Sequence, residues 1–411
     1  MKLADAFNMV VGPERNVSFR AYDGSTFGPQ DHDAILEITT PRAIQYLASA
    51  PSQLGIARAY VNGDLEIVGD AYTTLSRLYP MDTRHLTRSD KITLWKKFAP
   101  FAFKRPKPPT QERVLAGTRH SKRRDAQAIQ HHYDVSNRFY RWVLGPSMAY
   151  TCAVFPTEDA SLEVAQEGKF DLVARKLNLK PGMTLLDVGC GWGGMVLHAV
   201  KNYGVQAIGV TLSEQQAIWG QDAIKEAGLE GSAQIRFCDY RDVTETDFDA
   251  ISSIGLTEHI GRAHYPAYFS FLNDKLKPEG RMLNHTITRP GDTEPTHYRK
   301  SFINRYVFPD GELSAPGVIM NAFNDSGFEI RHGENLREHY ALTLKHWCQN
   351  LEDHWEEAVT EVGLGTARVW RLYMAASRMG FEMNTIQLHQ MLGVKLGPRG
   401  KSGMPLRAVF S

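Results

Sequence analysis

Residues 183–194 read MTLLDVGCGWGG, and this stretch decides the fold. The apolar run at its start predicts a short buried strand, which Asp187 interrupts. Gly189, Gly191 and Gly193 follow, and MVLHAVKNYG then carries apolar side chains at helical spacing. A strand, a glycine-rich turn and a helix in this order are typical of an open α/β sheet that binds a nucleotide-like ligand at the carboxyl ends of its strands. The glycines allow backbone N–H groups to approach that ligand.

Two details of the sequence indicate which ligand this is. Asp187 lies two residues before the first glycine, where a carboxylate can bind the amine of the methionine part of S-adenosylmethionine (SAM). A dinucleotide-binding fold carries an acid about 20 residues further on, but this chain reads GVTLS there. Thr211 and Gln216 are polar and uncharged, which suits a ribose. We therefore predict SAM in preference to NAD, with a plain tight turn between strand and helix as the alternative.

The composition is that of a globular protein with more than one core. The chain has 411 residues, of which 42% are hydrophobic and 10% aromatic, and this length favours two domains. Its four cysteines form no CxxC pair, so we predict no metal site, no disulfide framework and a reducing cytoplasmic location. The N-terminus lacks a signal-peptide pattern and no run of about 18 apolar residues occurs, so we expect no transmembrane segment.

Residues 96–124 concentrate positive charge. This segment holds ten Lys or Arg residues against one acid, Glu112, which makes its formal charge +9 in a chain of net charge +1. Trp95, Phe98 and Phe101 lie among the lysines. Basic and aromatic side chains together favour a surface that meets anionic lipid headgroups. A solvated linker is one alternative. Nucleic acid is the other, but we expect no such partner because no RNP, zinc or helix-turn-helix pattern accompanies the segment.

Strands and helices alternate regularly in the second half of the chain. The predicted strands cover residues 183–188, 205–212, 233–240, 248–256 and 281–288. Amphipathic helices separate them, and Ser213 is the expected N-cap of the helix after the second strand. This alternation predicts a parallel, doubly wound α/β sheet of the Rossmann-like type. Residues 289–325, rich in aromatics, proline and glycine, resemble an insertion or lid.

A smaller α+β unit precedes this sheet. Residues 17–28 alternate in polarity around Asp23 and Gly24, which predicts a hairpin. Residues 33–40 predict another strand, and a helix follows with Pro41 in its first turn. The unit contains no cluster of His, Cys or paired carboxylates that would do chemistry.

Nine motifs occur in order between residue 131 and about residue 381, namely HHYDVSNRFY, YTCAVF, LLDVGCGWGG, GVTLSEQQ, DYRD, SIGLTEHIG, LNHTI, REHYALTLKHW and RLYMAASRMGF. Together they resemble the cyclopropane-fatty-acyl-phospholipid synthases and their mycolic acid relatives. AYVNGDLEI is similar to the accessory domain of the phospholipid-acting members. The organisation expected on this basis is an accessory domain for lipid binding or dimerisation at 1–88, a basic aromatic linker at 89–125, and a SAM-dependent methyltransferase domain at 126–411.

The resemblance implies transfer of a methylene group from SAM to the cis double bond of an unsaturated phospholipid acyl chain, which forms a cyclopropane. The family uses a bound bicarbonate ion as the base. An alkene is a weak nucleophile, so SAM must be held close to it in a dry site, where aromatic faces can stabilise a cationic intermediate. The implied partner is an anionic phospholipid surface, with the enzyme peripheral on the inner face of the membrane, and a homodimer stays open.

By motif match, the residues that hold bicarbonate are Cys152, Glu258, His285, Ile287 and Tyr340. The resemblance implies backbone groups from Cys152 and Ile287. Glu258 is expected to accept the bicarbonate proton, while His285 and Tyr340 donate to its oxygens. The structural alternatives are a helix-start turn for Glu258, a satisfied core histidine for His285 and a small buried thiol for Cys152.

The family pattern assigns SAM binding to positions spread over 90 residues of the chain. They are Tyr150, Thr151, Asp187, Gly189, Gly191, Gly193, Thr211, Gln216, Asp239 and Tyr240. Tyr150 and Thr151 are expected near the carboxylate, and Asp239 and Tyr240 near the adenine. Ordinary packing at the sheet edge is the alternative for Tyr240.

One position departs from the family pattern. Ser377 in YMAASRMG stands where members commonly carry Cys. With bicarbonate as base a thiolate there is not required, so Ser377 is not among the predicted catalytic residues. Two other functions stay open: a methyl transfer that gives a methylene or methyl-branched chain, and a SAM- or lipid-binding protein without turnover. The presence of Glu258, His285 and Tyr340 argues against the latter.

Overall fold

The computed structural model describes residues 1–29, 33–79, 85–113, 119–120, 124, 135–293 and 301–410. It divides into two compact units. The first consists of Met1–Val114, Arg299–Pro309 and Leu351–Met379, and the second of Leu115–Tyr298, Asp310–Asn350 and Gly380–Ser411. This division differs from the predicted one, which gave residues 299–309 and 351–379 to the methyltransferase domain. The predicted boundary at residue 125, and residues 131–134 of the HHYDVSNRFY motif, lie outside the described residues.

The first unit is an α+β structure, as predicted. Its sheet has the order β2-β1-β3-β4, formed by β1 (Ser18–Ala21), β2 (Thr26–Phe27), β3 (Ala34–Ile38) and β4 (Leu65–Gly69). Its N-terminal helices are α1 (Leu3–Val11), α2 (Pro41–Ser49), α3 (Gln53–Val61), α4 (Ala71–Leu78) and α5 (Arg88–Ala102). The predicted hairpin is confirmed, with Gly24 at φ +74° in its turn. Pro41 starts α2, and the Thr40 hydroxyl accepts from the Arg42 N–H at 3.2 Å as its cap.

The segment predicted as a linker is largely part of this unit. Residues 88–102 form α5, which contacts α2 and contains no fully buried residue. Beyond it, the Tyr46 hydroxyl donates to the Lys107 carbonyl at 2.6 Å, and Arg58 makes two 2.7 Å hydrogen bonds to Glu112. These contacts order the chain up to residue 113. Residues 114–118, 121–123 and 125 lie outside the described residues.

Distant parts of the chain complete the first unit. Helices α13 (Phe302–Tyr306) and α16 (Trp355–Val362) and the greater part of α17 (Leu364–Glu382) belong to it. Arg368 of α17 donates to the Tyr60 carbonyl at 3.1 Å and pairs with Glu66. Arg371 donates to the Gly69 carbonyl at 2.7 Å. These mostly buried arginines satisfy carbonyls at the ends of α3 and β4, which attaches a late part of the sequence to the N-terminal sheet.

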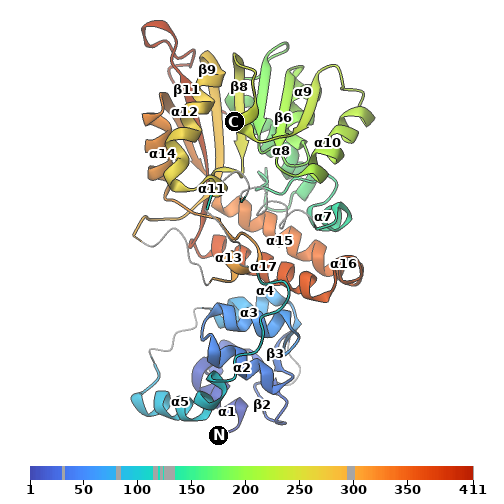
Figure 1. Ribbon diagram of the computed structural model, residues 1–411, viewed down its shortest axis with the longest axis vertical. Coiled ribbons are helices and arrows are strands. Elements are labelled where there is room, and N and C mark those ends of the chain that lie inside the picture. Colours follow the sequence, from blue (N-terminus) through green and yellow to red (C-terminus); the bar gives the residue numbers. More distant parts are fainter. Residues whose placement is uncertain are drawn as a thin grey trace. The chain divides into compact units, whose positions relative to one another are not determined.

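The second unit is built on a seven-stranded sheet of order β10-β11-β9-β8-β5-β6-β7. The strands are β5 (Thr184–Val188), β6 (Gln206–Thr211), β7 (Ala233–Phe237), β8 (Phe248–Ile254), β9 (Leu276–Thr288), β10 (Phe328–Asn335) and β11 (Gln387–Lys395). Figure 1 shows helices on both faces of this sheet, which confirms the doubly wound α/β fold. The strand order reverses between β5 and β8, and such a switch point is where open α/β sheets bind ligands.

The sheet differs from the prediction at three places. β11 was not predicted, and it pairs antiparallel with both β9 and β10, so the sheet is not wholly parallel. β9 begins at Leu276, five residues before the predicted start, and the ladder with β8 shifts register near the Pro278–Gly280 segment. The predicted lid at 289–325 is wrong where α14 (Pro316–Asp325) buries Phe323, whose ring stacks on Phe269 with centroids 4.8 Å apart. Residues 294–300 of that segment lie outside the described residues.

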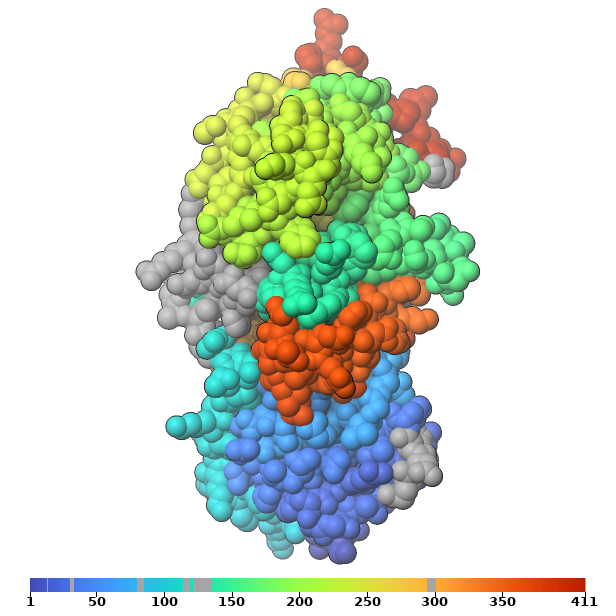
Figure 2. All heavy atoms as spheres, turned by 90° about the vertical axis from the view of Figure 1, so that its right-hand side faces the viewer, coloured from blue at the N-terminus to red at the C-terminus, as the bar shows by residue number. Residues whose placement is uncertain are grey.

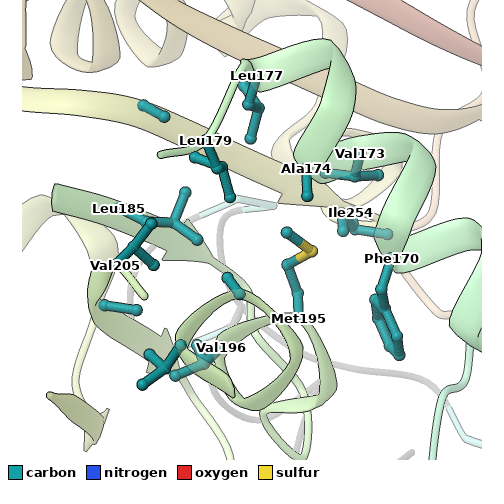
Figure 3. Packing of buried hydrophobic residues seen from close by; sticks show 14 of the residues in the cluster. Phe170, Val173, Ala174, Leu177, Leu179, Leu185, Met195, Val196, Val205 and Ile254 are labelled. Atoms are coloured by element: carbon teal, nitrogen blue, oxygen red, sulfur yellow. The ribbon is translucent and has the colours of Figure 1, made fainter. Parts of the chain in front are cut away.

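Helices on the two faces form two apolar cores. The remaining helices of this unit are α7 (Asn137–Leu144), α8 (Leu162–Leu177), α9 (Gly194–Tyr203), α10 (Glu214–Glu226), α11 (Thr257–Ile260), α12 (Tyr265–Lys275) and α15 (Arg337–Asp353). On one face, Val173 of α8, Leu185 of β5 and Met195 of α9 converge on one core (Figure 3). Ser213 caps α10, as predicted, by accepting from the Gln216 N–H at 3.3 Å. The outer side of α10 lies at the surface seen in Figure 2.

Candidate active site

A pocket lies at the carboxyl ends of β5, β6 and β8, at the switch point of the sheet. Eight of the ten residues predicted to bind SAM line it, namely Tyr150, Thr151, Asp187, Gly189, Gly191, Thr211, Gln216 and Tyr240. Gly193 and Asp239 are not part of its lining. The structure therefore brings together residues that are far apart in sequence at the place where the glycine-rich turn predicted a ligand.

The three glycines of the turn have different roles. Gly189, Gly191 and Gly193 all have positive φ, at +74°, +56° and +87°. A Cβ at Gly191 would meet no protein atom within 4 Å, so the space beside it belongs to the pocket. A Cβ at Gly193 would lie 2.1 Å from Ile235 Cδ1. The prediction that Gly193 faces the cofactor is therefore corrected, because its lack of a side chain lets the turn pack against Ile235 of β7.

Buried polar groups meet the pocket from β5 and β6. Asp187 is only 2% exposed, and its Oδ1 accepts from the Ser252 hydroxyl at 2.6 Å. Burial raises the pKa of Asp187 to about 6. The protein contacts of the carboxylate therefore do not fully offset the free energy lost when its charge is removed from water. The Thr211 hydroxyl donates to Gln216 Oε1 at 2.7 Å, which holds both side chains at the end of β6.

The end of β7 supplies an aromatic side chain and a structural acid. Tyr240 lines the pocket and packs edge-on against Tyr268, with ring centroids 5.2 Å apart. Asp239 instead accepts from the Arg241 backbone N–H at 2.9 Å and from its Nε at 2.7 Å. Asp239 thus caps the short turn that follows β7, and this correction leaves Tyr240 as the pocket residue of the pair.

Several residues of the pocket wall were not predicted. They include Lys169, Cys190, Trp192, Leu256 and His259. The Trp192 indole N–H donates to Asn137 Oδ1 at 2.9 Å, which joins the turn to α7. Lys169 had a detectable signal in the sequence, because it falls on the apolar stripe of its helix beside Phe170. A charged residue on a core-facing stripe is rare unless it has a partner or a function.

Glu258 lies in α11, directly after β8, and is 7% exposed. Its Oε2 accepts from the Thr286 hydroxyl at 2.7 Å, and its Oε1 lies 3.4 Å from the Ile287 N–H, which donates to it. Burial raises the pKa of Glu258 above its ordinary value. Glu258 and Ile287, predicted from separate motifs, are therefore in direct contact.

His285 is held by a chain of three polar side chains. Lys176 Nζ donates to Gln390 Oε1 at 2.6 Å, which orients the Gln390 amide so that its nitrogen faces His285 Nδ1 at 3.1 Å. Burial, with the charges of Lys169 and Lys176, lowers the pKa of His285 well below its ordinary range. The neutral ring accepts at Nδ1 and must carry its proton on Nε2, a tautomer assigned from this network. Nε2 is buried and has no hydrogen-bond partner among the described residues.

Cys152 and Tyr340 meet at Leu336. The Cys152 thiol contacts the Ala153 carbonyl at 3.1 Å and the Leu336 carbonyl at 3.8 Å, while the Tyr340 N–H donates to the same Leu336 carbonyl at 3.2 Å. The Leu336 N–H donates to Leu388, which pairs with Ile287 across β9 and β11. Burial raises the pKa of Cys152, so its thiol stays protonated.

The predicted bicarbonate residues do not line the cofactor pocket, but Gly255 connects the two groups. Gly255 lines the pocket, and its N–H donates to the His285 carbonyl at 2.8 Å. A Cβ at Gly255 would lie 3.0 Å from Thr151 Cγ2 and 4.0 Å from Glu258 Oε1. Gly255 therefore lies between the cofactor wall and a second cluster, which consists of Cys152, Glu258, His285, Ile287 and Tyr340.

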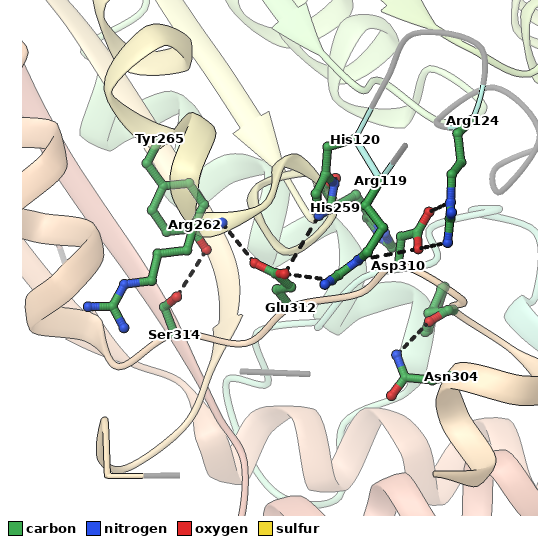
Figure 4. Close-up of polar contacts among 11 residues, drawn as sticks. Arg119, His120, Arg124, His259, Arg262, Tyr265, Asn304, Asp310, Glu312 and Ser314 are labelled. Atoms are coloured by element: carbon green, nitrogen blue, oxygen red, sulfur yellow. Dashed lines mark hydrogen bonds and ion pairs between the residues drawn. The ribbon is translucent and has the colours of Figure 1, made fainter. Parts of the chain in front are cut away.

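A polar network that the sequence did not predict supports α11 (Figure 4). The Glu312 N–H donates to the Glu258 carbonyl at 2.9 Å, and Glu312 Oε2 accepts from the Arg262 N–H at 3.0 Å. Arg119 donates to Glu312 Oε1 at 2.5 Å, and His120 Nδ1 donates to the His259 carbonyl at 3.1 Å. His120, whose Nε2 lies 3.7 Å from Glu312 Oε1, then the Arg262 N–H and the charge of Arg119 lower the pKa of Glu312 to about 2. Glu312 thus stays ionised and holds the turn that carries Glu258.

Two kinds of feature are absent from the described parts of the chain. No three His, Cys, Asp or Glu side chains gather there as a metal site. No helix there combines the length and the apolar character needed to cross a bilayer.

The sheet order, the glycine-rich turn and the pocket at the switch point define the SAM-dependent methyltransferase fold. The family model for mycolic acid cyclopropane synthetase matches residues 120–391. A probable fatty acid methyltransferase of Mycobacterium tuberculosis is 53% identical over 407 residues, covering 95% of this chain and 94% of that protein. A probable fatty acid methyltransferase of Pseudomonas putida is 37% identical over 94% of this chain and 93% of its own length.

A solved structure points to the same family. A mycolic acid cyclopropane synthase complexed with SAH and CTAB shares 33% sequence identity with a TM-score of 0.62, covering 66% of this chain and 98% of that one. The chain belongs to the mycolic acid cyclopropane synthetase family. It is a SAM-dependent methyltransferase that acts on lipids, and the predicted family and fold are confirmed.

Proposed function

We propose that the protein transfers a methylene group from SAM to the cis double bond of unsaturated phospholipid acyl chains, with a bound bicarbonate as base. The observations that carry this proposal are a buried donor, His285 Nε2–H, and a buried carboxylate, Glu258. Gly255 connects them, because its N–H donates to the His285 carbonyl at 2.8 Å and a Cβ there would lie 4.0 Å from Glu258 Oε1. An anion that carries a hydroxyl needs donors for its oxygens and an acceptor for its proton. His285 supplies a donor and Glu258 supplies an acceptor, which supports the binding of such an anion at the second cluster.

The cofactor pocket fits SAM through groups of matching polarity. When bound, SAM supplies an electrophilic methyl group. Gly189 and Gly191 expose backbone at the turn, Thr211 and Gln216 present polar groups for the ribose, and the Asp187 carboxylate suits the amine. The walls are otherwise mostly apolar, which excludes water from the reacting groups.

The base must take up a proton without itself being alkylated, and bicarbonate, when bound, supplies that property. The protonation states of the residues in the second cluster limit which of them can accept a proton. His285 cannot accept a proton at Nε2, because Gln390 occupies the lone pair at Nδ1 and the ring proton is on Nε2. Cys152 is a neutral thiol. Of these residues Glu258 is the one carboxylate, so it is the group that accepts a proton and holds it at its Oε atoms.

A second candidate function within the family is transfer of a methyl group to give a methylene or methyl-branched acyl chain. The observation that favours it is the naming of the relatives at 53% and 37% identity as probable fatty acid methyltransferases. Both reactions need the same cofactor pocket, and they differ in how the substrate loses its proton.

We further propose that α5 meets the phospholipid on the inner face of the membrane. Trp95 is 69% exposed and Phe103, just after the helix, 88% exposed. Lys91, Lys96 and Lys97 are exposed on the same helix. Exposed aromatic rings between lysines suit the headgroup region of an anionic leaflet.

Mass spectrometry of lipids from cells that express the protein tests the product. A gain in mass of one CH₂ group with loss of the alkene is expected for a cyclopropane. The same gain with the alkene retained supports a methylene product or a methyl-branched chain that keeps a double bond. No change in phospholipid acyl chains, when free fatty acids are modified, would refute the phospholipid substrate.

A further inference from the structure

Lys169 of α8 is a buried lysine in the wall of the cofactor pocket. Its side chain is only 1% exposed, and it lines the pocket together with Thr151 and Asp187. Lysine is among the residues least often buried without a partner. The position therefore calls for an anionic group or for a structural contact that offsets the cost of burial.

The protein contacts of Lys169 satisfy it only in part. Its Nζ donates to the Thr151 hydroxyl at 2.9 Å and lies 3.8 Å from the centroid of the Phe170 ring. An ammonium group has three donors, and a neutral hydroxyl and an aromatic face leave its charge without an anion. Among the described residues, no carboxylate lies within ion-pair distance of Nζ.

Two buried groups of opposite charge thus share one pocket. Burial lowers the pKa of Lys169 to about 7 and raises the pKa of Asp187 to about 6. The protein does not fully neutralise the charge of either group, although the charges of Lys169 and Asp187 partly stabilise each other. A ligand that carries both an ammonium and a carboxylate complements this pair, and the methionyl part of SAM carries both.

We propose that Lys169 binds the carboxylate of the methionyl group of SAM, with the Thr151 hydroxyl beside it, while Asp187 binds the ammonium. This inference rests on SAM as the cofactor and deepens the assignment of its site. The binding is an ion pair in a dry pocket, and the Lys169–Thr151 hydrogen bond sets the direction in which the ammonium points. The position of Lys169 on α8 connects cofactor binding to a helix that lies before the glycine-rich turn in the sequence.

A competing role for Lys169 is support of the second cluster. Its charge also acts on His285 and on Cys152. In that role, loss of the lysine would leave cofactor affinity unchanged and would alter only the anion site. A purely structural role would instead weaken every ligand of the pocket to the same extent.

Calorimetry with two ligands separates these possibilities. SAH carries the amino and carboxyl groups of the methionyl part, whereas 5′-methylthioadenosine lacks both and keeps the adenosine and the sulfur. The Lys169→Met variant keeps an unbranched apolar side chain of similar length. We expect it to bind SAH roughly 10- to 100-fold more weakly than the wild type, since a hydrogen bond to a charged group contributes that much. Its affinity for 5′-methylthioadenosine should stay within about threefold.

The control is Lys201→Met, which removes an exposed lysine of α9. It should leave both affinities unchanged, so a general effect of net charge is excluded. Proton uptake gives a second measurement in the wild type. At about pH 8, SAH binding should take up a proton at Lys169, seen as an enthalpy that depends on the buffer, and this uptake should be smaller for Lys169→Met and for 5′-methylthioadenosine.

An equal loss of affinity for both ligands in Lys169→Met, or no loss for SAH, would overturn the proposal. Neither result would affect SAM as the cofactor, because that rests on binding of both ligands by the wild type. Failure of the wild type to bind either ligand would contradict the cofactor itself. Lipid turnover is not measured in this experiment, so its outcome is independent of the product that the enzyme forms.

Discussion

Replacing Glu258 by Gln tests the proposed bicarbonate site most directly, because the structure can accommodate the amide. Gln Oε1 can accept from the Ile287 N–H in place of the carboxylate oxygen. Gln Nε2 can donate to the Thr286 hydroxyl, which can turn to donate to the Ile287 carbonyl, 3.3 Å away. The two local hydrogen bonds are kept, and the change removes mainly the negative charge and the acceptor for a proton.

The expected fall in kcat follows from the loss of this proton acceptor. General acid–base catalysis contributes about 10²–10⁴-fold, which is ~2.7–5.4 kcal/mol at about 1.36 kcal/mol per tenfold. We expect kcat of Glu258→Gln to fall by this factor, while SAH affinity changes by less than about threefold, because Glu258 does not line the cofactor pocket. Stripping bicarbonate from the buffer should slow the wild type, and returning it should restore the rate.

Stability gives an independent readout with a defined sign. Burial raises the folded-state pKa of Glu258, so its contribution to stability is present below the unfolded pKa of about 4.3 and is lost as pH rises through the folded value. Glu258→Gln has no such loss and should be more stable, relative to the wild type, at neutral pH than at about pH 4. A variant that turns over lipid at the wild-type rate would refute the role of Glu258. If Glu258→Gln lost activity only because it unfolds, its melting temperature would be lower than that of the wild type at every pH.

Three further predictions concern the cofactor, the membrane and the buried acid. Gly191→Val should abolish SAH binding in calorimetry, because its side chain enters the pocket, whereas Gly228→Val, with a similar positive φ and open space around it, should bind normally. Replacing Trp95 and Phe103 by Ser should lower co-sedimentation with anionic vesicles by roughly tenfold or more, and added salt should weaken wild-type binding; equal binding of the wild type to neutral vesicles would contradict an electrostatic surface. Asp187→Asn should stabilise the ligand-free protein by ~3 kcal/mol relative to the wild type at about pH 8. The folded-state pKa of Asp187 is raised from 3.8 to about 6, so the wild type loses stability as pH rises through about 6, whereas the amide does not titrate. Urea unfolding at about pH 4 and pH 8 checks this, and a gain that is independent of pH would contradict it.

The sequence by itself determined the features that depend on neighbouring residues. The strand, glycine turn and helix around Gly191 form as predicted, since each depends on local backbone freedom and periodicity. Ser213 caps α10 as predicted, because an N-cap also depends only on residues close in sequence. Glu258 directly follows a predicted strand, so its position at the carboxyl edge of the sheet could be foreseen, and the family resemblance identified its partner Ile287 before the contact was known.

The tertiary structure alone decided what depends on contacts between distant residues. Arg368 attaches a late helix to Tyr60 in the first unit, although no local pattern marks that helix as foreign to the second unit. β11 is inserted antiparallel between two strands that precede it, and its mixed burial pattern does not show its neighbours. The His285 proton is set by Gln390, 105 residues away, whose amide is in turn oriented by Lys176. Hydrogen-bond direction and burial are properties of the assembled core, and therefore residue type and spacing cannot encode them locally.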